Sequence, residues 1–133
     1  MIVLDTSALV AIILGEPEAE AFTTVLASGQ AFWISALTVF ECETVIRARK
    51  DQTLVSRVRE LLALCRATVL AFDDNQAALA TQAYLEFGKG VHPPRLNLCD
   101  CAAYALAKSL NAPLLYKGDD FAMTDIARAV APG

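Results

Sequence analysis

Short apolar runs alternate with longer stretches of helical hydrophobic spacing along the chain. The runs have the length of buried strands and lie at 1–4, 32–34, 68–72 and 114–116. Helical spacing follows each of the first three runs and precedes the last, and it predicts helices at 8–14, 18–28, 36–50, 51–65, a stretch ending near 87, and 99–110. Strands separated by helices are typical of a parallel sheet covered on both faces. We therefore expect an α/β fold with a central, mostly parallel sheet flanked by helices.

Residues that cap or break helices stand at several predicted boundaries. Thr6 or Ser7 can cap the first helix, and Ser35 can cap the helix that begins at Ala36. The break Gly15-Glu16-Pro17 ends the first helical pattern, while 88–95 is an irregular stretch rich in Gly and Pro. These signals place the ends of the elements, and the tail from 125 to 130 is short enough to add only an edge strand.

Composition favours one apolar, mildly acidic domain. The 133 residues match a common domain size, and no repeat or linker divides them, so we expect 1–133 to form a single domain. No apolar run reaches the roughly 18 residues that cross a bilayer, and the start lacks the basic segment of a signal peptide. The four cysteines lack the paired spacing of a zinc site and are expected to be reduced and mostly buried. We expect a cytoplasmic protein that does not associate with a membrane.

The net charge of −4 argues against a conventional nucleic-acid binder, because phosphate contacts use basic patches. An acidic nuclease can nevertheless hold phosphate through divalent cations. The charge therefore lowers the rank of nucleic acid as a partner without excluding it.

Several acids stand at strand ends and helix starts rather than on solvated helix faces. Asp5 directly follows the first apolar run, and Glu41 shares helical spacing with Leu37 and Val45 on a stripe expected to be buried. The others are Asp100, near the start of an Ala-rich helix, and Asp119 and Asp120, after the last strand. Any one of them alone would be a helix cap or an ion-pair partner. Together they fall at one edge of the expected sheet, where the carboxyl ends of strands collect ligands.

Carboxylates that converge repel one another unless a cation neutralises them. Oxygen ligands suit Mg²⁺ or Mn²⁺, which activate water and stabilise charge on phosphate oxygens. The only histidine, His92, lies in the irregular stretch 88–95, so we expect no Ser-His-Asp set, and no glycine loop opens a helix after a strand as a phosphate-binding motif would. Metal-dependent phosphodiester hydrolysis is the chemistry that remains.

These motifs, in this order, resemble the PIN-domain ribonucleases, and more narrowly the VapC-type toxins of bacterial type II toxin–antitoxin pairs. The resemblance covers essentially the whole chain and is carried by 1–8, Glu41, 96–107, 114–121 and 124–126. It implies a PIN-like α/β/α sandwich, dependence on Mg²⁺ or Mn²⁺ and endonucleolytic cleavage of RNA. It also implies a cognate VapB-type antitoxin and a homodimer.

The resemblance also assigns roles to the acids. Asp5 and Asp100 would be the principal metal ligands, and Glu41 would join them directly or through water. The acid before Phe121 matches the family pattern best, which favours Asp120 over Asp119 as the fourth. The resemblance thus predicts Asp5, Glu41, Asp100 and Asp120 as catalytic and metal-binding residues.

Four further residues near these acids in sequence also bear on the site. Asp125 could add a weak or outer ligand, and Thr6 or Ser7 could hold a metal-bound water. The family often has Gly before the third acid, whereas this chain has Cys99. That departure concerns the fine geometry near Asp100 rather than activity.

Two groups of residues have both a functional and a plain structural interpretation. Lys89, His92 and Arg95 could contact RNA phosphates or simply belong to a solvated loop, with equal support for each. A set of large apolar residues could form a partner surface, but core packing is the better interpretation for them; they are Phe22, Leu26, Phe32, Trp33 and Phe40.

Three rival functions share parts of this pattern. A haloacid-type, metal-dependent phosphatase needs a second acid two residues after the first, where Ser7 stands. A response-regulator receiver needs a phospho-accepting acid after a middle strand, where Ser35 stands. A catalytically inactive PIN-fold module that binds RNA or protein has no need to keep four placed acids.

Overall fold

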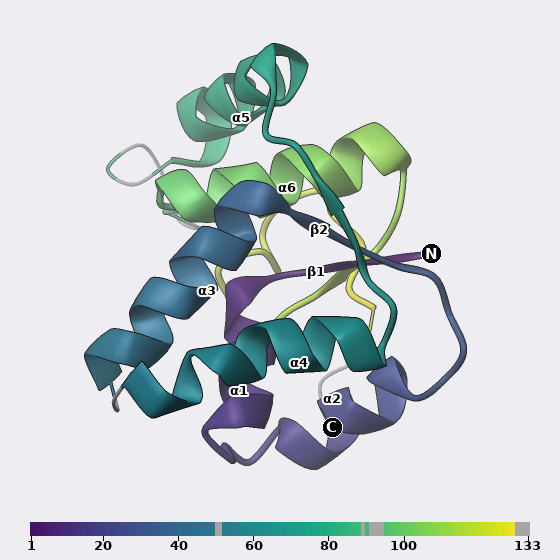
Figure 1. The fold of residues 1–133 in the computed structure, drawn as a ribbon. Helices are drawn as coiled ribbons and strands as arrows, with labels where there is room; N and C mark the ends of the chain where they lie inside the picture. Colours follow the sequence, from purple (N-terminus) through teal and green to yellow (C-terminus); the bar gives the residue numbers. More distant parts are fainter. Residues whose placement is uncertain (50–51, 89, 91–94, 130–133) are drawn as a thin grey trace.

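Four parallel strands form the centre of the protein. Its computed structural model (Figure 1) describes residues 1–49, 52–88, 90 and 95–129. The strands are β1 (Ile2–Leu4), β2 (Phe32–Ser35), β3 (Thr68–Leu70) and β4 (Leu114–Leu115). Their order across the sheet is β3-β2-β1-β4, and every neighbouring pair is parallel. The expected parallel α/β sheet is confirmed, although β3 and β4 end earlier than the apolar runs predicted.

Helices cover both faces of this sheet. They are α1 (Thr6–Ile13), α2 (Ala19–Leu26), α3 (Ala36–Arg49), α4 (Ser56–Leu64), α5 (Asp74–Phe87) and α6 (Leu98–Leu110). The prediction of one helix over 51–65 was wrong, because a 3-10 turn at Gln52–Leu54 precedes α4. The tail contributes an isolated parallel bridge between Leu114 and Arg128.

Side chains of the central strand alternate between two hydrophobic cores. Ile2 and Leu4 belong to the core under α1, α2, α3 and α4, whereas Val3 belongs to the core under α5 and α6. In Figure 1, α5 and α6 lie above the sheet and α1, α2 and α4 lie below it. A strand buried on both faces has no solvent-facing side, which is why its sequence is an unbroken apolar run.

Most of the apolar residues considered for a partner surface lie in these cores. Phe22, Leu26 and Phe32 are buried, and Trp33 is half-buried. Phe40 is the exception, since 63% of its surface is exposed. Core packing therefore explains this set except for Phe40.

The buried stripe of α3 is Thr38, Val39, Cys42 and Ile46. Glu41 lies on a neighbouring, half-buried stripe with Leu37 and Val45, so the prediction that this stripe would be buried was wrong. That position is chemically reasonable, because it exposes the Glu41 carboxylate at the edge of the core. Glu43 points elsewhere and pairs with Arg59 of α4 at 3.3 Å.

Cys42 and Cys101 are buried, Cys65 and Cys99 are half-buried, and all four are free thiols. No helix within the described ranges is long and apolar enough to cross a membrane.

Candidate active site

The carboxyl ends of β1 and β4, the first turns of α1 and α6, and one side of α3 enclose a cleft of about 390 Å³. The acids Asp5, Glu41, Asp100 and Asp120 all line it. Residues as far apart in sequence as Asp5 and Asp120 therefore line one cleft, because the parallel strands β1 and β4 deliver their ends to one edge of the sheet.

Asp5 caps helix α1 with its own side chain. Its Oδ2 accepts hydrogen bonds from the Ser7 backbone N–H at 3.0 Å and from Ser7 Oγ at 2.6 Å. The prediction that Thr6 or Ser7 would be the cap was therefore wrong by one or two residues. Because the cap follows the strand without a spacer, the helix begins where the sheet ends and the acid stays buried, with 3% of its surface exposed.

The second oxygen of this carboxylate is the distinctive feature of the cleft. Asp5 Oδ1 is buried and has no hydrogen-bond partner within the described chain. Burial raises the pKa of Asp5 to about 6; the bonds from Ser7 lower it and the nearby charge of Glu41 raises it. An unpartnered buried carboxylate oxygen is costly unless a proton or a cation satisfies it.

Ser7 links Asp5 to the end of strand β4. The Lys117 backbone N–H donates to Ser7 Oγ at 2.9 Å, and Ser7 Oγ donates in turn to Asp5 Oδ2. The Asp5 N–H also donates to Leu115 O at 3.1 Å. These bonds hold the Asp5 carboxylate in register with the segment that carries Asp120.

Asp100 belongs to a capping box at the start of α6. Asn97 Oδ1 accepts from the Asp100 N–H at 2.8 Å, and Asp100 Oδ2 accepts from the Asn97 N–H at 2.9 Å. This reciprocal pair fixes the side chain while it satisfies two free helix N–H groups. Burial raises the pKa of Asp100 to about 7, and the charges of Asp5, Glu41 and Asp120 add to that increase.

Thr6 holds the third acid. Its Oγ1 donates to Glu41 Oε1 at 2.5 Å and lies 3.4 Å from the carbonyl oxygen of Thr38. Thr6 is buried and belongs to the first turn of α1, so this contact ties α1 to α3 across the cleft. Nearby, burial and the Glu41 carboxylate raise the pKa of Cys99 to about 11, which keeps that thiol protonated at neutral pH.

Asp119 and Asp120, the two aspartates before Phe121, differ in their position relative to the cleft. Both are exposed, and of the two it is Asp120 that lines the cleft. Asp125 lies in a separate environment, where it accepts hydrogen bonds from Tyr104 Oη at 2.5 Å and from Lys108 Nζ. Those two donors lower the pKa of Asp125 and leave it engaged away from the other acids.

The cleft is also lined by basic side chains that the sequence pattern did not reveal. Arg49 from the end of α3 and Lys117 after β4 line it, and both contact Glu16. Their sequence separations from Glu16 are 33 and 101 residues, so no local spacing could have identified them. Of the basic residues considered earlier, Lys89 and His92 lie outside the described residues, while Arg95 is exposed.

The donor set suits a hard divalent cation. It consists of carboxylate oxygens, one of them buried and unpartnered, which Mg²⁺ and Mn²⁺ prefer. As the described side chains stand, no three Asp, Glu, His or Cys residues are grouped closely enough to hold a metal ion. The fit of this cleft to a divalent cation therefore rests on the unpartnered Asp5 Oδ1 and on the negative charge of the four acids that line the cleft.

Comparison with known proteins identifies the class. The model of the PIN-domain family matches residues 2–127, so this chain belongs to the PIN-domain family. Curated relatives extend the likeness over nearly the whole chain. Ribonuclease VapC28 of Mycobacterium tuberculosis is 38% identical over 129 residues, covering 96% of this chain and 97% of that protein. Ribonuclease VapC of Mycolicibacterium smegmatis is 44% identical over 128 residues, covering 94% and 97%. Within the PIN domains, the chain belongs with the VapC ribonucleases, which confirms the resemblance seen in its motifs.

Solved structures show the same fold. The VapC20 toxin of Mycobacterium tuberculosis, described as cleaving the sarcin-ricin loop, matches with a TM-score of 0.81 at 14% identity, covering 97% of this chain and 98% of that one. The VapBC2 complex of Rickettsia felis, solved with a promoter DNA fragment, matches with a TM-score of 0.71 at 19% identity, covering 96% of both chains. At these identities the match shows the fold alone.

Proposed function

We propose that this protein is a metal-dependent endoribonuclease that acts as the toxin of a type II toxin–antitoxin pair. The observation that carries the proposal is the convergence of four acids on one cleft, with Asp5 Oδ1 buried and unpartnered among the described residues. The VapC ribonucleases to which the chain is 38–44% identical support RNA as the substrate. An RNA target would place its action in the cytoplasm.

Each acid has a defined part in this proposal. Asp5 and Asp100 would hold the metal, with Glu41 and Asp120 beside them, and Mg²⁺ or Mn²⁺ would supply a water of lowered pKa and charge stabilisation at the phosphate. Ser7 orients the Asp5 carboxylate, and Asn97 orients that of Asp100. Glu41, which accepts a hydrogen bond from Thr6, would accept the proton of an attacking water.

Preorganisation is what the protein itself contributes. Helix caps fix Asp5 and Asp100, and the hydroxyls of Ser7 and Thr6 donate to Asp5 and Glu41, so these three carboxylates lose little freedom when a substrate and cation enter. Burial is the main cause of the raised pKa values of Asp5 and Asp100, and repulsion from neighbouring carboxylates adds to it. A cation that bound there would relieve this repulsion.

The chemistry of the cleaved ends tests the proposal. Attack by water with the 3′ oxygen as the leaving group gives a 5′-phosphate and a 3′-hydroxyl, whereas attack by the RNA 2′-hydroxyl expels the 5′ oxygen and gives a cyclic phosphate. We expect 5′-phosphate ends in Mg²⁺ or Mn²⁺ and no cleavage in EDTA, measured by end mapping on a mixed RNA. Cyclic phosphate ends formed in EDTA, or RNA bound but left uncut with either metal, would overturn it.

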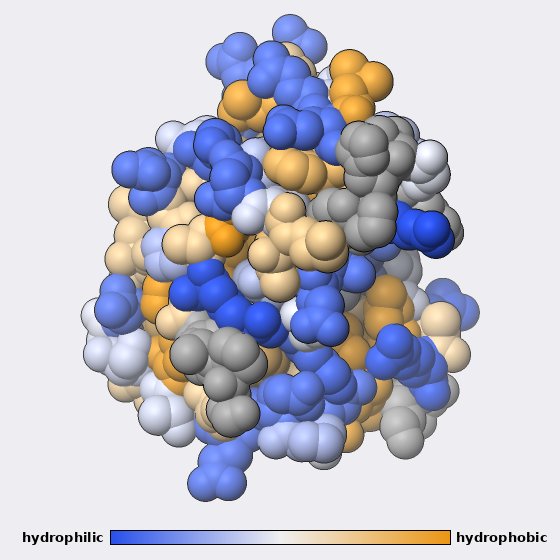
Figure 2. Space-filling model, turned by 180° about the vertical axis from the view of Figure 1, so that it is seen from behind, coloured by the Kyte–Doolittle hydropathy of each residue, from blue (hydrophilic) through white to orange (hydrophobic). Residues whose placement is uncertain are grey.

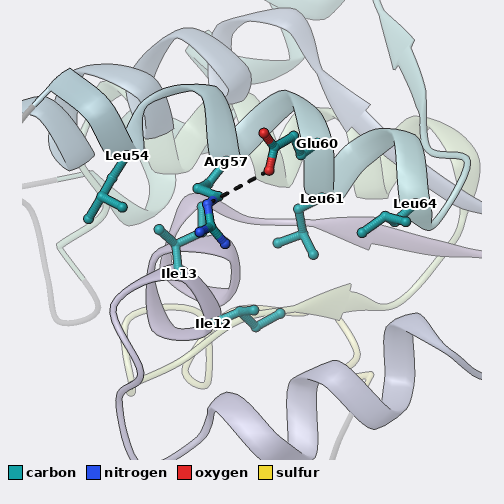
Figure 3. A pocket seen from close by; sticks show the side chains of 7 residues that line it. All are labelled: Ile12, Ile13, Leu54, Arg57, Glu60, Leu61 and Leu64. Atoms are coloured by element: carbon teal, nitrogen blue, oxygen red, sulfur yellow. Dashed lines mark ion pairs between the residues drawn. The ribbon is translucent and has the colours of Figure 1, made fainter.

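A groove between α1 and α4 supports an antitoxin partner. Ile12 and Ile13 of α1 face Leu61 and Leu64 of α4 across a cavity of about 230 Å³, and Arg57 and Glu60 form an ion pair at 3.7 Å on its rim (Figure 3). Leu64 is 81% exposed. An apolar floor with a charged rim suits an amphipathic helix. We assign this groove to a VapB-type antitoxin.

A second apolar surface supports the homodimer. Leu37, Tyr84, Leu85 and Leu98 border a cavity of about 360 Å³ between α3, α5 and α6. Leu85 and Leu98 are 71% and 70% exposed, and hydrophobic residues reach the surface near α5 at the top of Figure 2. Because large exposed apolar patches mark interaction sites, we assign this face to self-association.

A further inference from the structure

One carboxylate at the rim of the acidic cleft forms ion pairs with two basic side chains. Glu16 Oε1 lies 3.1 Å from Lys117 Nζ, and Glu16 Oε2 lies 3.5 Å from Arg49 Nη1. Lys117 Nζ is also 3.4 Å from Glu18 Oε1. Glu16, Arg49 and Lys117 line the same cleft as Asp5 and Asp100. The two oxygens of Glu16 thus bridge α3 and the segment after β4.

The backbone at the end of α1 holds Glu16 in this position. Gly15 has φ of +66° and its N–H donates to Ile12 O at 3.3 Å, while the Glu16 N–H donates to Ala11 O at 2.9 Å. These two bonds are those of a Schellman motif, which ends a helix with a left-handed residue, usually Gly. The break Gly15-Glu16-Pro17 therefore does more than stop a helix, because it directs the next side chain toward the cleft.

Arg49 and Lys117 are the only basic side chains of the described residues that line this cleft. An RNA strand that approached the four acids would be repelled, so these two cations are the groups available to attract its phosphates. In the free protein Glu16 pairs with both, and Glu18 also contacts Lys117. The side chains of Arg49 and Lys117 remain 57% and 34% exposed, so water and an incoming anion can reach them.

A phosphodiester and a carboxylate present similar groups to such a pair. Each carries one negative charge shared between two oxygens, and each can accept hydrogen bonds from both cations. Ion pairs whose basic partner water can reach are also weak, so a phosphate could replace the carboxylate at small cost.

We propose that Glu16 is a built-in competitor for an RNA backbone phosphate, which holds Arg49 and Lys117 until the substrate displaces it. Glu16 then sets the affinity for RNA without taking part in the reaction at the acids. The inference rests on the proposed ribonuclease function, and it adds the residues that receive the backbone beside the cleaved bond.

Glu16→Gln tests this directly, because glutamine keeps the size and the backbone motif but removes the charge. The matched control is Glu20→Gln on the exposed face of α2, which changes the net charge equally. Binding is measured by fluorescence anisotropy with a labelled 12-residue oligouridylate in the Asp5→Asn background. The kinetic constants for RNA cleavage are measured in the otherwise wild-type protein.

Glu16→Gln should tighten oligouridylate binding about five- to tenfold at low salt and lower KM by a similar factor, with kcat within about twofold of wild type. The salt dependence of binding should steepen by up to about one unit in log–log slope, because binding no longer releases a carboxylate that takes up a counterion. Adding Arg49→Ala and Lys117→Ala should abolish the gain. That last result separates a direct competitor from a general effect of charge.

Three outcomes would overturn the inference. Glu16→Gln could bind RNA as wild type or as Glu20→Gln does, it could lower kcat at unchanged KM, or its gain could persist without Arg49 and Lys117. If wild type cleaves RNA in Mg²⁺ while one of these is found, the inference alone fails. If no variant binds or cleaves RNA under any condition, the proposed function fails with it.

Discussion

Ser7 Oγ donates to Asp5 Oδ2 at 2.6 Å while it accepts from the backbone N–H of Lys117 at 2.9 Å. One hydroxyl therefore orients the buried acid at the end of β1 and joins it to the segment after β4. The bond from Ser7 also lowers the pKa of Asp5 against the larger effect of burial. We therefore expect activity to depend on Ser7 as well as on the acids.

Ser7→Ala should raise the pKa of Asp5 further and shift the acidic limb of the pH–rate profile to higher pH. It should also destabilise the fold by about 1–3 kcal/mol, because the Lys117 N–H loses its acceptor. The measurements are cleavage rate against pH and urea unfolding. Ser7→Thr, which keeps the hydroxyl, is the control, and an unchanged profile in Ser7→Ala would show that Ser7 does not tune Asp5.

The raised pKa of Asp5 predicts how the metal-free protein responds to pH. A carboxyl whose pKa rises on folding holds its proton more tightly in the folded state, so stability is lost as pH climbs from the ordinary value of 3.8 through about 6. For Asp5 this loss is about 3 kcal/mol, and Asp100 acts in the same direction toward pH 7.

Asp5→Asn should therefore be more stable than wild type at pH 7.5 in EDTA, and its unfolding free energy should fall less between pH 4.5 and 7.5. Urea titrations at several pH values measure this difference. Asp119→Asn, an exposed acid close by, serves as the control and should follow wild type. Equal pH slopes for Asp5→Asn and wild type would mean that folding does not raise the pKa of Asp5.

The bond from Thr6 to Glu41 predicts a dependence of rate on a residue that is not acidic. Thr6→Val keeps the shape of the buried side chain but frees Glu41 Oε1, so kcat should fall about tenfold or more with a stability change near 1 kcal/mol. Thr6→Ser should retain activity, and Thr23→Val on the exposed face of α2 should change neither kcat nor stability. Cleavage by Thr6→Val as fast as by Thr6→Ser would contradict the role given to Thr6.

The two apolar surfaces predict separable defects. Leu64→Asp should prevent co-purification with the antitoxin while the protein keeps its dimer and its nuclease activity. Leu85→Asp should give a monomer by light scattering and still bind the antitoxin. Both side chains are largely exposed, so each variant should fold. If both variants lose both partners, or neither loses any, the two assignments are wrong.

The alternation of apolar runs and helical spacing was enough to predict the parallel sheet, because buried strands and amphipathic helices leave distinct periods in a sequence. The acids at strand ends were visible for the same reason. The helix caps were less predictable. Asp5 itself caps α1, and Asn97 caps α6, although the pattern Asn97-x-x-Asp100 is a recognisable capping box.

Contacts between distant segments could not be predicted from local pattern. The bridge from Glu16 to Arg49 and Lys117 joins three elements, and the sequence showed Glu16 only as part of a helix break. Likewise, Asp125 was a candidate outer ligand until the fold placed it beside Tyr104 and Lys108. Long polar side chains find partners that depend on the packing of the whole chain.

The most direct test of the central claim compares RNA cleavage by wild type, Asp5→Asn and Asp100→Asn in saturating Mg²⁺. Wild type should cleave and should stop in EDTA. Each variant should cleave about a thousandfold more slowly or not at all, since metal-assisted charge stabilisation is worth several kcal/mol, and yet should unfold no earlier on heating than wild type. Cleavage by either folded variant at the wild-type rate would show that the acids at the end of β1 and the start of α6 are not the catalytic centre.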